Sequence, residues 1–159
     1  MWTNFFITSA EAAATLAGLV IVAVSVNITR ILAHPQLPAR AGAAVSTLIL
    51  ILLSSMATLI PQSIRILGAE LIFFGACCWI IEVFSAQKSI VARRVSHRPI
   101  HESLIHVFFG QLQTLPFIIG GALMVLNNPA GIYGIAFGVM VVFFASMSNA
   151  WVLLVEILR

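Results

Sequence analysis

The chain has 159 residues, of which 61% are hydrophobic and only 8% are charged, whereas charged residues make up roughly a quarter of an ordinary soluble domain. Its eight Lys and Arg residues and five acidic residues, all Glu, cannot give every surface element a polar face, which excludes a water-soluble fold. The pI near 9.5 does not indicate nucleic-acid binding, because the basic residues lie in short segments between apolar runs, as is typical of contact with the lipid bilayer.

Five apolar runs each approach the roughly 20 residues that a membrane-spanning helix requires. The sequence therefore predicts an all-α, polytopic transmembrane helix bundle that forms a single domain. In chain order, the predicted spans cover residues 6–29, 41–60, 66–86, 103–126 and 131–155. Turns rich in proline and polar residues separate most of these spans, and a longer basic loop is predicted over residues 87–102.

Basic residues are distributed unevenly between the two sides of this five-span arrangement. Seven fall after the first, third and fifth spans, and only Arg65 falls on the other side. Because cationic loops remain in the cytoplasm, we expect the N-terminus outside and the C-terminus inside. The residues of the predicted basic loop that we expect to contact lipid headgroups are Lys88, Arg93, Arg94 and Arg98.

A stripe of small and polar residues runs along the first predicted span. Its members are spaced alternately three and four residues apart, so they share one face of a helix: Thr8, Glu11, Thr15, Gly18, Val22, Ser25 and Thr29. In lipid such a face is expected to turn inward, toward protein or a water-filled path. Two interpretations stay open: close helix packing, or the lining of a pore, with Glu11, Thr15, Gly18 and Ser25 as candidates.

Glu11 is the most informative single residue, because a carboxylate inside a membrane must be paired, protonated or hydrated. Glu70 lies at a similar outer level on the third span, and Arg65 lies near the start of that span. The sequence predicts an outer cluster of these three side chains. The cluster is interpreted either as a structural ion pair or as an outward-facing cation or proton site.

The fourth span carries a second polar stripe, with Gln113 near the middle of the membrane and Pro116 three residues later. Gln113 must find a hydrogen-bond partner there, and Pro116 is expected to bend the helix. At the inner level, Glu82 is expected to form a polar cluster with Glu102 and His106. A polar, broken helix is found at transport sites and also in ordinary membrane packing.

The fifth span contains a GxxxG motif formed by Gly134 and Gly138, which predicts a close helix–helix contact within or between subunits. The neighbouring Cys77 and Cys78 point about 100° apart on a helix and are expected to be inert thiols. His101 and His106 are five residues apart, so they do not form the four-apart histidine pair of zinc proteases. The sequence predicts neither an enzyme nor a bound metal or cofactor.

The segment Ala10–Ala41, AEAAATLAGLVIVAVSVNITRILAHPQLPARA, resembles a family of small bacterial inner-membrane proteins, some of which are labelled modulators of FtsH protease. Pro61-Gln62 and Gly68-Ala69-Glu70-Leu71 are similar to that family's second turn and third helix. The resemblance covers roughly the first half of the chain. It implies location in a bacterial inner membrane and supplies no active site.

Two functions fit these patterns. The first is a small oligomeric channel or transport-like protein in which the first helix of each copy lines a polar path. The second is a non-catalytic accessory or regulatory subunit bound to other membrane proteins, which the glycine face of the fifth span and the basic loop favour. A homo-oligomer would help to bury the polar faces of so thin a bundle.

Overall fold

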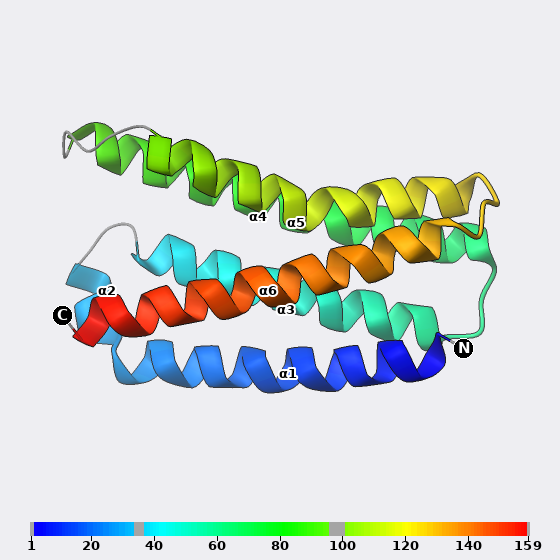
Figure 1. The fold of residues 1–159 in the computed structure, drawn as a ribbon, viewed down its shortest axis with the longest axis horizontal. Helices are drawn as coiled ribbons and strands as arrows, with labels where there is room; N and C mark the ends of the chain where they lie inside the picture. Colours follow the sequence, from blue (N-terminus) through cyan, green and yellow to red (C-terminus); the bar gives the residue numbers. More distant parts are fainter. Residues whose placement is uncertain (1, 34–36, 96–100, 159) are drawn as a thin grey trace.

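The computed structural model describes residues 2–33, 37–95 and 101–158, and within this part of the chain it is helical without any strand, as the sequence predicts. The five long helices alternate in direction along the chain, and one short helix follows the first (Figure 1). The elements in chain order are α1 Thr3–Val26, α2 Ile28–Ala33, α3 Leu37–Leu59, α4 Ile64–Val95, α5 His101–Val125 and α6 Gly131–Leu158.

Four of these helices contain stretches that are long and apolar enough to cross a membrane: Thr3–Val26, Ala41–Leu59, Ile64–Gln87 and Gly131–Ser148. Among the described residues, α5 adds a shorter apolar stretch, Gly110–Val125. Large apolar side chains such as Leu19, Phe73 and Phe144 face outward, as lipid contact requires. The protein is therefore an integral membrane protein built as a helical bundle.

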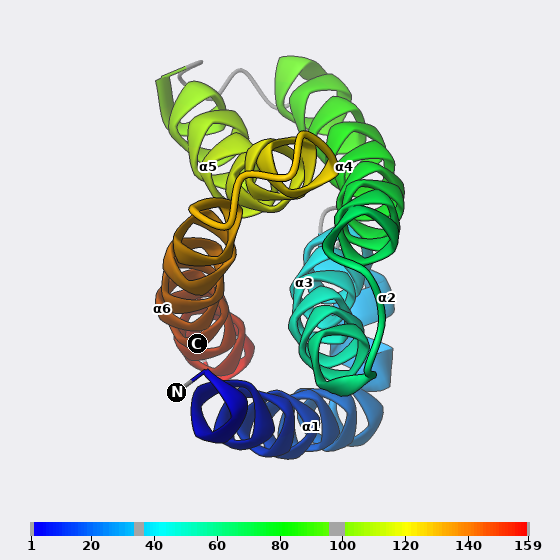
Figure 2. The same ribbon diagram turned by 90° about the vertical axis from the view of Figure 1, so that its right-hand side faces the viewer.

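The five long helices form a ring in the order α1, α3, α4, α5, α6 when the bundle is viewed along its length (Figure 2). The most extensive contacts join α4 to α5, α1 to α3 and α5 to α6, whereas α1 touches α6 only sparsely. The two termini lie at opposite ends of the bundle (Figure 1), which five crossings would produce. We call the end that holds the start of α1 and the turns α3–α4 and α5–α6 the N-terminal end of the bundle, and the other end its C-terminal end.

Glycines allow α4, α5 and α6 to pack closely. Gly68 of α4 faces Gly121 of α5, and a Cβ on Gly68 would lie 2.6 Å from the Gly121 carbonyl oxygen. Gly134 and Gly138 of α6 lie against α5, where a Cβ on Gly138 would approach the Phe117 ring to 2.8 Å. The glycine face of α6 is thus used within the chain.

Several boundaries differ by a few residues from the sequence prediction, and two of the differences change an element. The first helix ends at Val26, the side-chain amide of the following Asn27 donates to the Ala23 carbonyl at 3.0 Å, and Thr29 belongs to the separate helix α2. The segment predicted as a basic loop is helical as far as Val95, because Gln87–Val95 contains no glycine or proline to end α4. Residues 96–100 of that loop lie outside the described part of the chain.

Candidate functional site

The polar stripe of the first helix faces away from the rest of the chain. Every one of its seven members is exposed, and the buried side chains of α1 are Phe6, Ser9, Ala13 and Val20. This buried set follows the same three-and-four spacing but is displaced by two residues, which is about 200° around a helix. The expectation that the stripe turns inward is therefore wrong for the single chain.

The hydroxyl groups of the stripe are bonded within their own helix. Thr15 Oγ1 donates to the Glu11 carbonyl and Ser25 Oγ donates to the Ile21 carbonyl, each at 2.8 Å. Such bonds leave an exposed Ser or Thr with no unmet hydrogen-bond donor, so these residues can face lipid at low cost.

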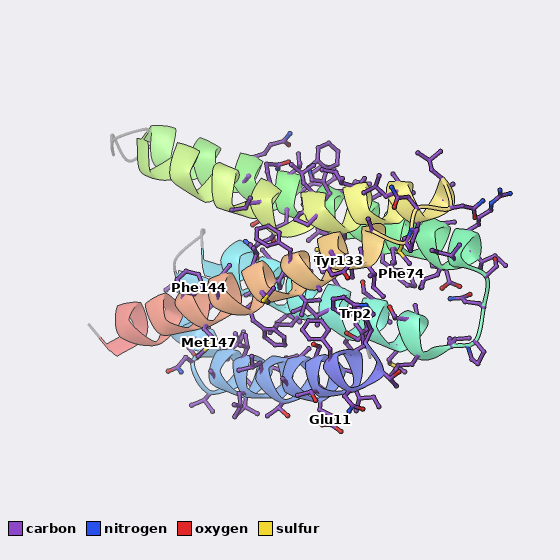
Figure 3. All side chains as sticks on the ribbon, turned by 45° about the vertical axis from the view of Figure 1, so that its right-hand side comes forward. Trp2, Glu11, Phe74, Tyr133, Phe144 and Met147 are labelled. Carbon is purple, nitrogen blue, oxygen red and sulfur yellow. The ribbon has the colours of Figure 1, made fainter. Side chains whose placement is uncertain are left out.

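The Glu11 side chain has no comparable bond among the described residues. It points away from the bundle (Figure 3), and no described side chain donates to its carboxylate. Glu11 lies eight residues after Thr3, so it is about 12 Å along α1. A carboxylate facing hydrocarbon at that depth costs several kcal/mol unless water, protons or another molecule meet it.

The structure does not assemble the predicted outer cluster. The Glu70 carboxylate accepts a hydrogen bond of 2.7 Å from Gln62 Nε2. Arg65 Nε donates to Asn127 Oδ1, in the α5–α6 turn, at 3.0 Å. Glu11 lies across the ring from both, because α1 and α4 are on opposite sides (Figure 2). The sequence correctly predicted that these three residues lie toward the same end of the bundle, but it did not predict their hydrogen-bond partners.

A second group of polar residues lies inside the ring. Gln113 is only 4% exposed, and Thr114 beside it is fully buried. Thr47 of α3 donates to the Ala44 carbonyl at 3.0 Å, so the 3.4 Å contact between Thr47 and Ser146 of α6 has Ser146 as donor. This contact joins two helices that are 99 residues apart in sequence.

Sequence reasoning missed the polar face of α3. The signal was present, because Ala44, Thr47, Ile51, Ser54 and Thr58 repeat the three-and-four spacing seen in α1. Unlike the α1 stripe, most of this face is buried. The structure thus places small polar residues from α3, α5 and α6 in the bundle interior.

Glu82 lies toward the C-terminal end of the bundle and is half-buried on α4. Its carboxylate rests beside Gly110 of α5, where a Cβ would lie 3.0 Å from Glu82 Oε2. One turn away, Trp79 Nε1 donates to Gln111 Oε1. The other expected members of this inner layer are outside the described part of the structure: the side chains of Glu102, His106, Lys88, Arg93 and Arg94, and the whole of Arg98.

Substitution of Ser54 tests how the polar residues in the bundle interior affect stability. Its hydroxyl is fully buried and has no hydrogen-bond partner among the described residues. Ser54→Ala is therefore expected to raise the free energy of unfolding by about 1 kcal/mol, because an unsatisfied buried hydroxyl costs about 1–3 kcal/mol. Thr47→Ala, which removes the contact with Ser146, is expected to lower it by about 1 kcal/mol. Unfolding in mixed micelles measures both, and a larger loss for Ser54→Ala would contradict the assignment.

Among the residues that the structure describes, no three His, Cys, Asp or Glu side chains gather to hold a metal. Searches against protein-family models, curated proteins and solved structures gave no match to the chain. The candidate site is therefore the outward stripe of α1, with Glu11 as its one carboxylate.

Proposed function

We propose that the protein is a small homo-oligomeric membrane channel in which the α1 stripe of each copy lines a shared polar path. One observation carries this proposal: Glu11 is exposed on the outer face of a membrane-spanning helix and has no protein partner in the described chain. Copies arranged around an axis would remove the carboxylates from lipid and surround a hydrated path with them. The nearby Thr15, Gly18 and Ser25 leave room for such a path because their side chains are small.

The arrangement of the helices supports this choice over the accessory-subunit alternative. That alternative drew on the glycine face of the last span and on the basic loop. Gly134 and Gly138 lie against α5 of the same chain, and the basic side chains of the loop lie outside the described residues. The α1 stripe, by contrast, is left uncovered. Charge in a narrow path raises the local concentration of counter-ions, so a ring of Glu11 carboxylates favours cations over anions.

Crosslinking tests the arrangement of copies. In a chain with Cys77 and Cys78 replaced by alanine, Thr15→Cys and Ser25→Cys are expected to form disulfide-linked dimers in membranes, because equivalent positions converge around an axis. Met140→Cys is the matched control, since Met140 is 57% exposed on α6, away from the stripe. Dimers at Met140 but not on α1, or a stoichiometric foreign protein after mild-detergent purification, would overturn the proposal, and the latter would favour the accessory subunit.

Conductance tests the function itself. Purified protein in planar bilayers is expected to pass a cation-selective current, and Glu11→Gln is expected to lower it roughly tenfold at low ionic strength. Glu70→Gln is the control, because it removes the same charge on the opposite side of the ring. There the Glu70 carboxylate accepts a hydrogen bond from Gln62. An absence of current, or an equal loss from both substitutions, would contradict the assignment of Glu11.

We further propose that the protein resides in a bacterial inner membrane, with its N-terminus outside the cytoplasm. The resemblance of Ala10–Ala41 to small bacterial inner-membrane proteins, some labelled modulators of FtsH protease, supports the first part. The distribution of basic residues, with only Arg65 at the N-terminal end, supports the second. A reporter that is active only in the cytoplasm is therefore expected to be active when fused to the C-terminus and inactive when fused to the N-terminus. The opposite result would contradict this orientation.

A further inference from the structure

A cavity of about 480 Å³ lies at the N-terminal end of the bundle, separate from the α1 stripe. Its wall includes Trp2 before α1, Ile64 of α4, Met124 of α5, and Ile132 and Tyr133 of α6. The volume falls within the roughly 300–1,000 Å³ that is typical of small-ligand sites. Since most of these side chains are apolar, the cavity suits a hydrocarbon group.

Two aromatic rings mark the membrane level at which the cavity lies. Trp2 and Tyr133 meet edge to face, with ring centroids 5.1 Å apart (Figure 3). Tryptophan and tyrosine prefer the boundary between hydrocarbon and headgroups. The rings also join α1 to α6, two helices that otherwise touch only sparsely.

An exposed cation, Arg65, is adjacent in sequence to the cavity wall. Arg65 follows the cavity residue Ile64, and Asn127, which accepts from Arg65 Nε at 3.0 Å, precedes the cavity residue Asn128. Asn127 has a left-handed backbone, with φ of 60°, because it ends α5, and this turn presents its side chain toward Arg65. The terminal guanidinium nitrogens have no acceptor among the described residues and remain available to a phosphate, which guanidinium groups bind in a bidentate manner.

We propose that this end of the protein binds one phospholipid, with an acyl chain in the cavity and the phosphate on Arg65. The apolar wall and the oriented guanidinium together recognise the two parts of one amphiphile. The surrounding membrane supplies the ligand at high local concentration. This site does not depend on the proposed channel and would exist in a single copy.

Photolabelling tests the site. The full chain is placed in vesicles containing a trace of phosphatidylglycerol that carries a diazirine near the end of one acyl chain. After irradiation, adducts are expected on Met124, Ile132 and Tyr133. Arg65→Gln is expected to reduce these adducts about tenfold, whereas Arg30→Gln, at the other end of the bundle, leaves them unchanged.

Filling the cavity provides a second, independent variant. Ala130 lines the cavity but is exposed, so Ala130→Trp adds bulk there without removing a core side chain, and it is expected to abolish the adducts. Ala122→Trp, at an exposed position of α5 outside the cavity wall, is the matched control. Adducts spread evenly over lipid-facing residues, with no effect of either cavity variant, would overturn the site. Equal labelling by a diacylglycerol with the same diazirine would overturn the phosphate contact.

Discussion

Replacing Gly68 by alanine is expected to lower the free energy of unfolding by about 3 kcal/mol. The new Cβ would lie 2.6 Å from the Gly121 carbonyl oxygen and 2.8 Å from the Val125 nitrogen. Both are backbone atoms, which cannot rotate away as a side chain can, so α4 and α5 must move apart along their contact. Overpacking of a close-packed core costs about 1–3 kcal/mol, and the upper part of that range applies to a contact between two backbones.

Gly42 provides the control for this substitution. It lies in α3, is exposed, and has no atom within 4 Å of the position that a Cβ would take. Gly42→Ala is therefore expected to be neutral or to stabilise the helix by about 0.5–1 kcal/mol. The measurement is reversible unfolding in mixed micelles, followed by tryptophan fluorescence. Equal losses from the two substitutions would show that the Gly68–Gly121 approach does not determine stability.

Truncation of Phe117 is expected to have a still larger effect, a loss of about 3–5 kcal/mol in Phe117→Ala. The side chain is fully buried, and it lies between α4 and α6, next to Gly75 on one side and Gly138 on the other. Removing the ring leaves a void at the centre of the three glycine-packed helices. The same unfolding assay in mixed micelles measures the loss, and a cost below that of Thr47→Ala would contradict this placement.

A double-mutant cycle that combines Phe117→Ala with Gly138→Ala tests whether the Phe117 ring contacts Gly138. A Cβ on Gly138 would lie 2.8 Å from Phe117 Cε2 and 3.1 Å from Pro116 Cβ. Without the Phe117 ring only the second contact remains, so Gly138→Ala should cost less in the Phe117→Ala background than alone. We expect a coupling of about 1 kcal/mol or more between the two positions. Additive losses would mean that the ring and the glycine do not meet.

Much of the fold could be predicted from the sequence, because the membrane requires long apolar helices and few other structures. The spans begin and end within a few residues of the predicted positions. The short helix after Asn27 was missed because no glycine or proline marks the break, where the Asn27 side chain bonds to the Ala23 carbonyl. The helical extension to Val95 was missed because basic residues were taken as a loop, although Ala, Arg and Lys favour helices.

The direction of the α1 stripe could not be predicted, for a physical reason. A three-and-four repeat shows which residues share a face, but α1 carries two such faces, displaced by two residues. In water the apolar face would be the buried one. In lipid either face can be buried or exposed, so packing against α3 determines which face of α1 is buried. That packing buries the face that carries Phe6 and Ala13. The partners of Arg65 and Glu70 were likewise set by turns that the sequence pattern does not position.

The place of α6 in the ring has a consequence for how the protein is made. The chain can leave the insertion machinery as two helical pairs, α1 with α3 and α4 with α5, which hold two of the most extensive contacts. The helix that follows them, α6, packs on α5 and also reaches α3, through Ser146 and Thr47. Contacts between α3 and α4 already join the two pairs, so α6 closes the ring, and without α6 one side of Phe117 and of Thr47 is uncovered within the bilayer.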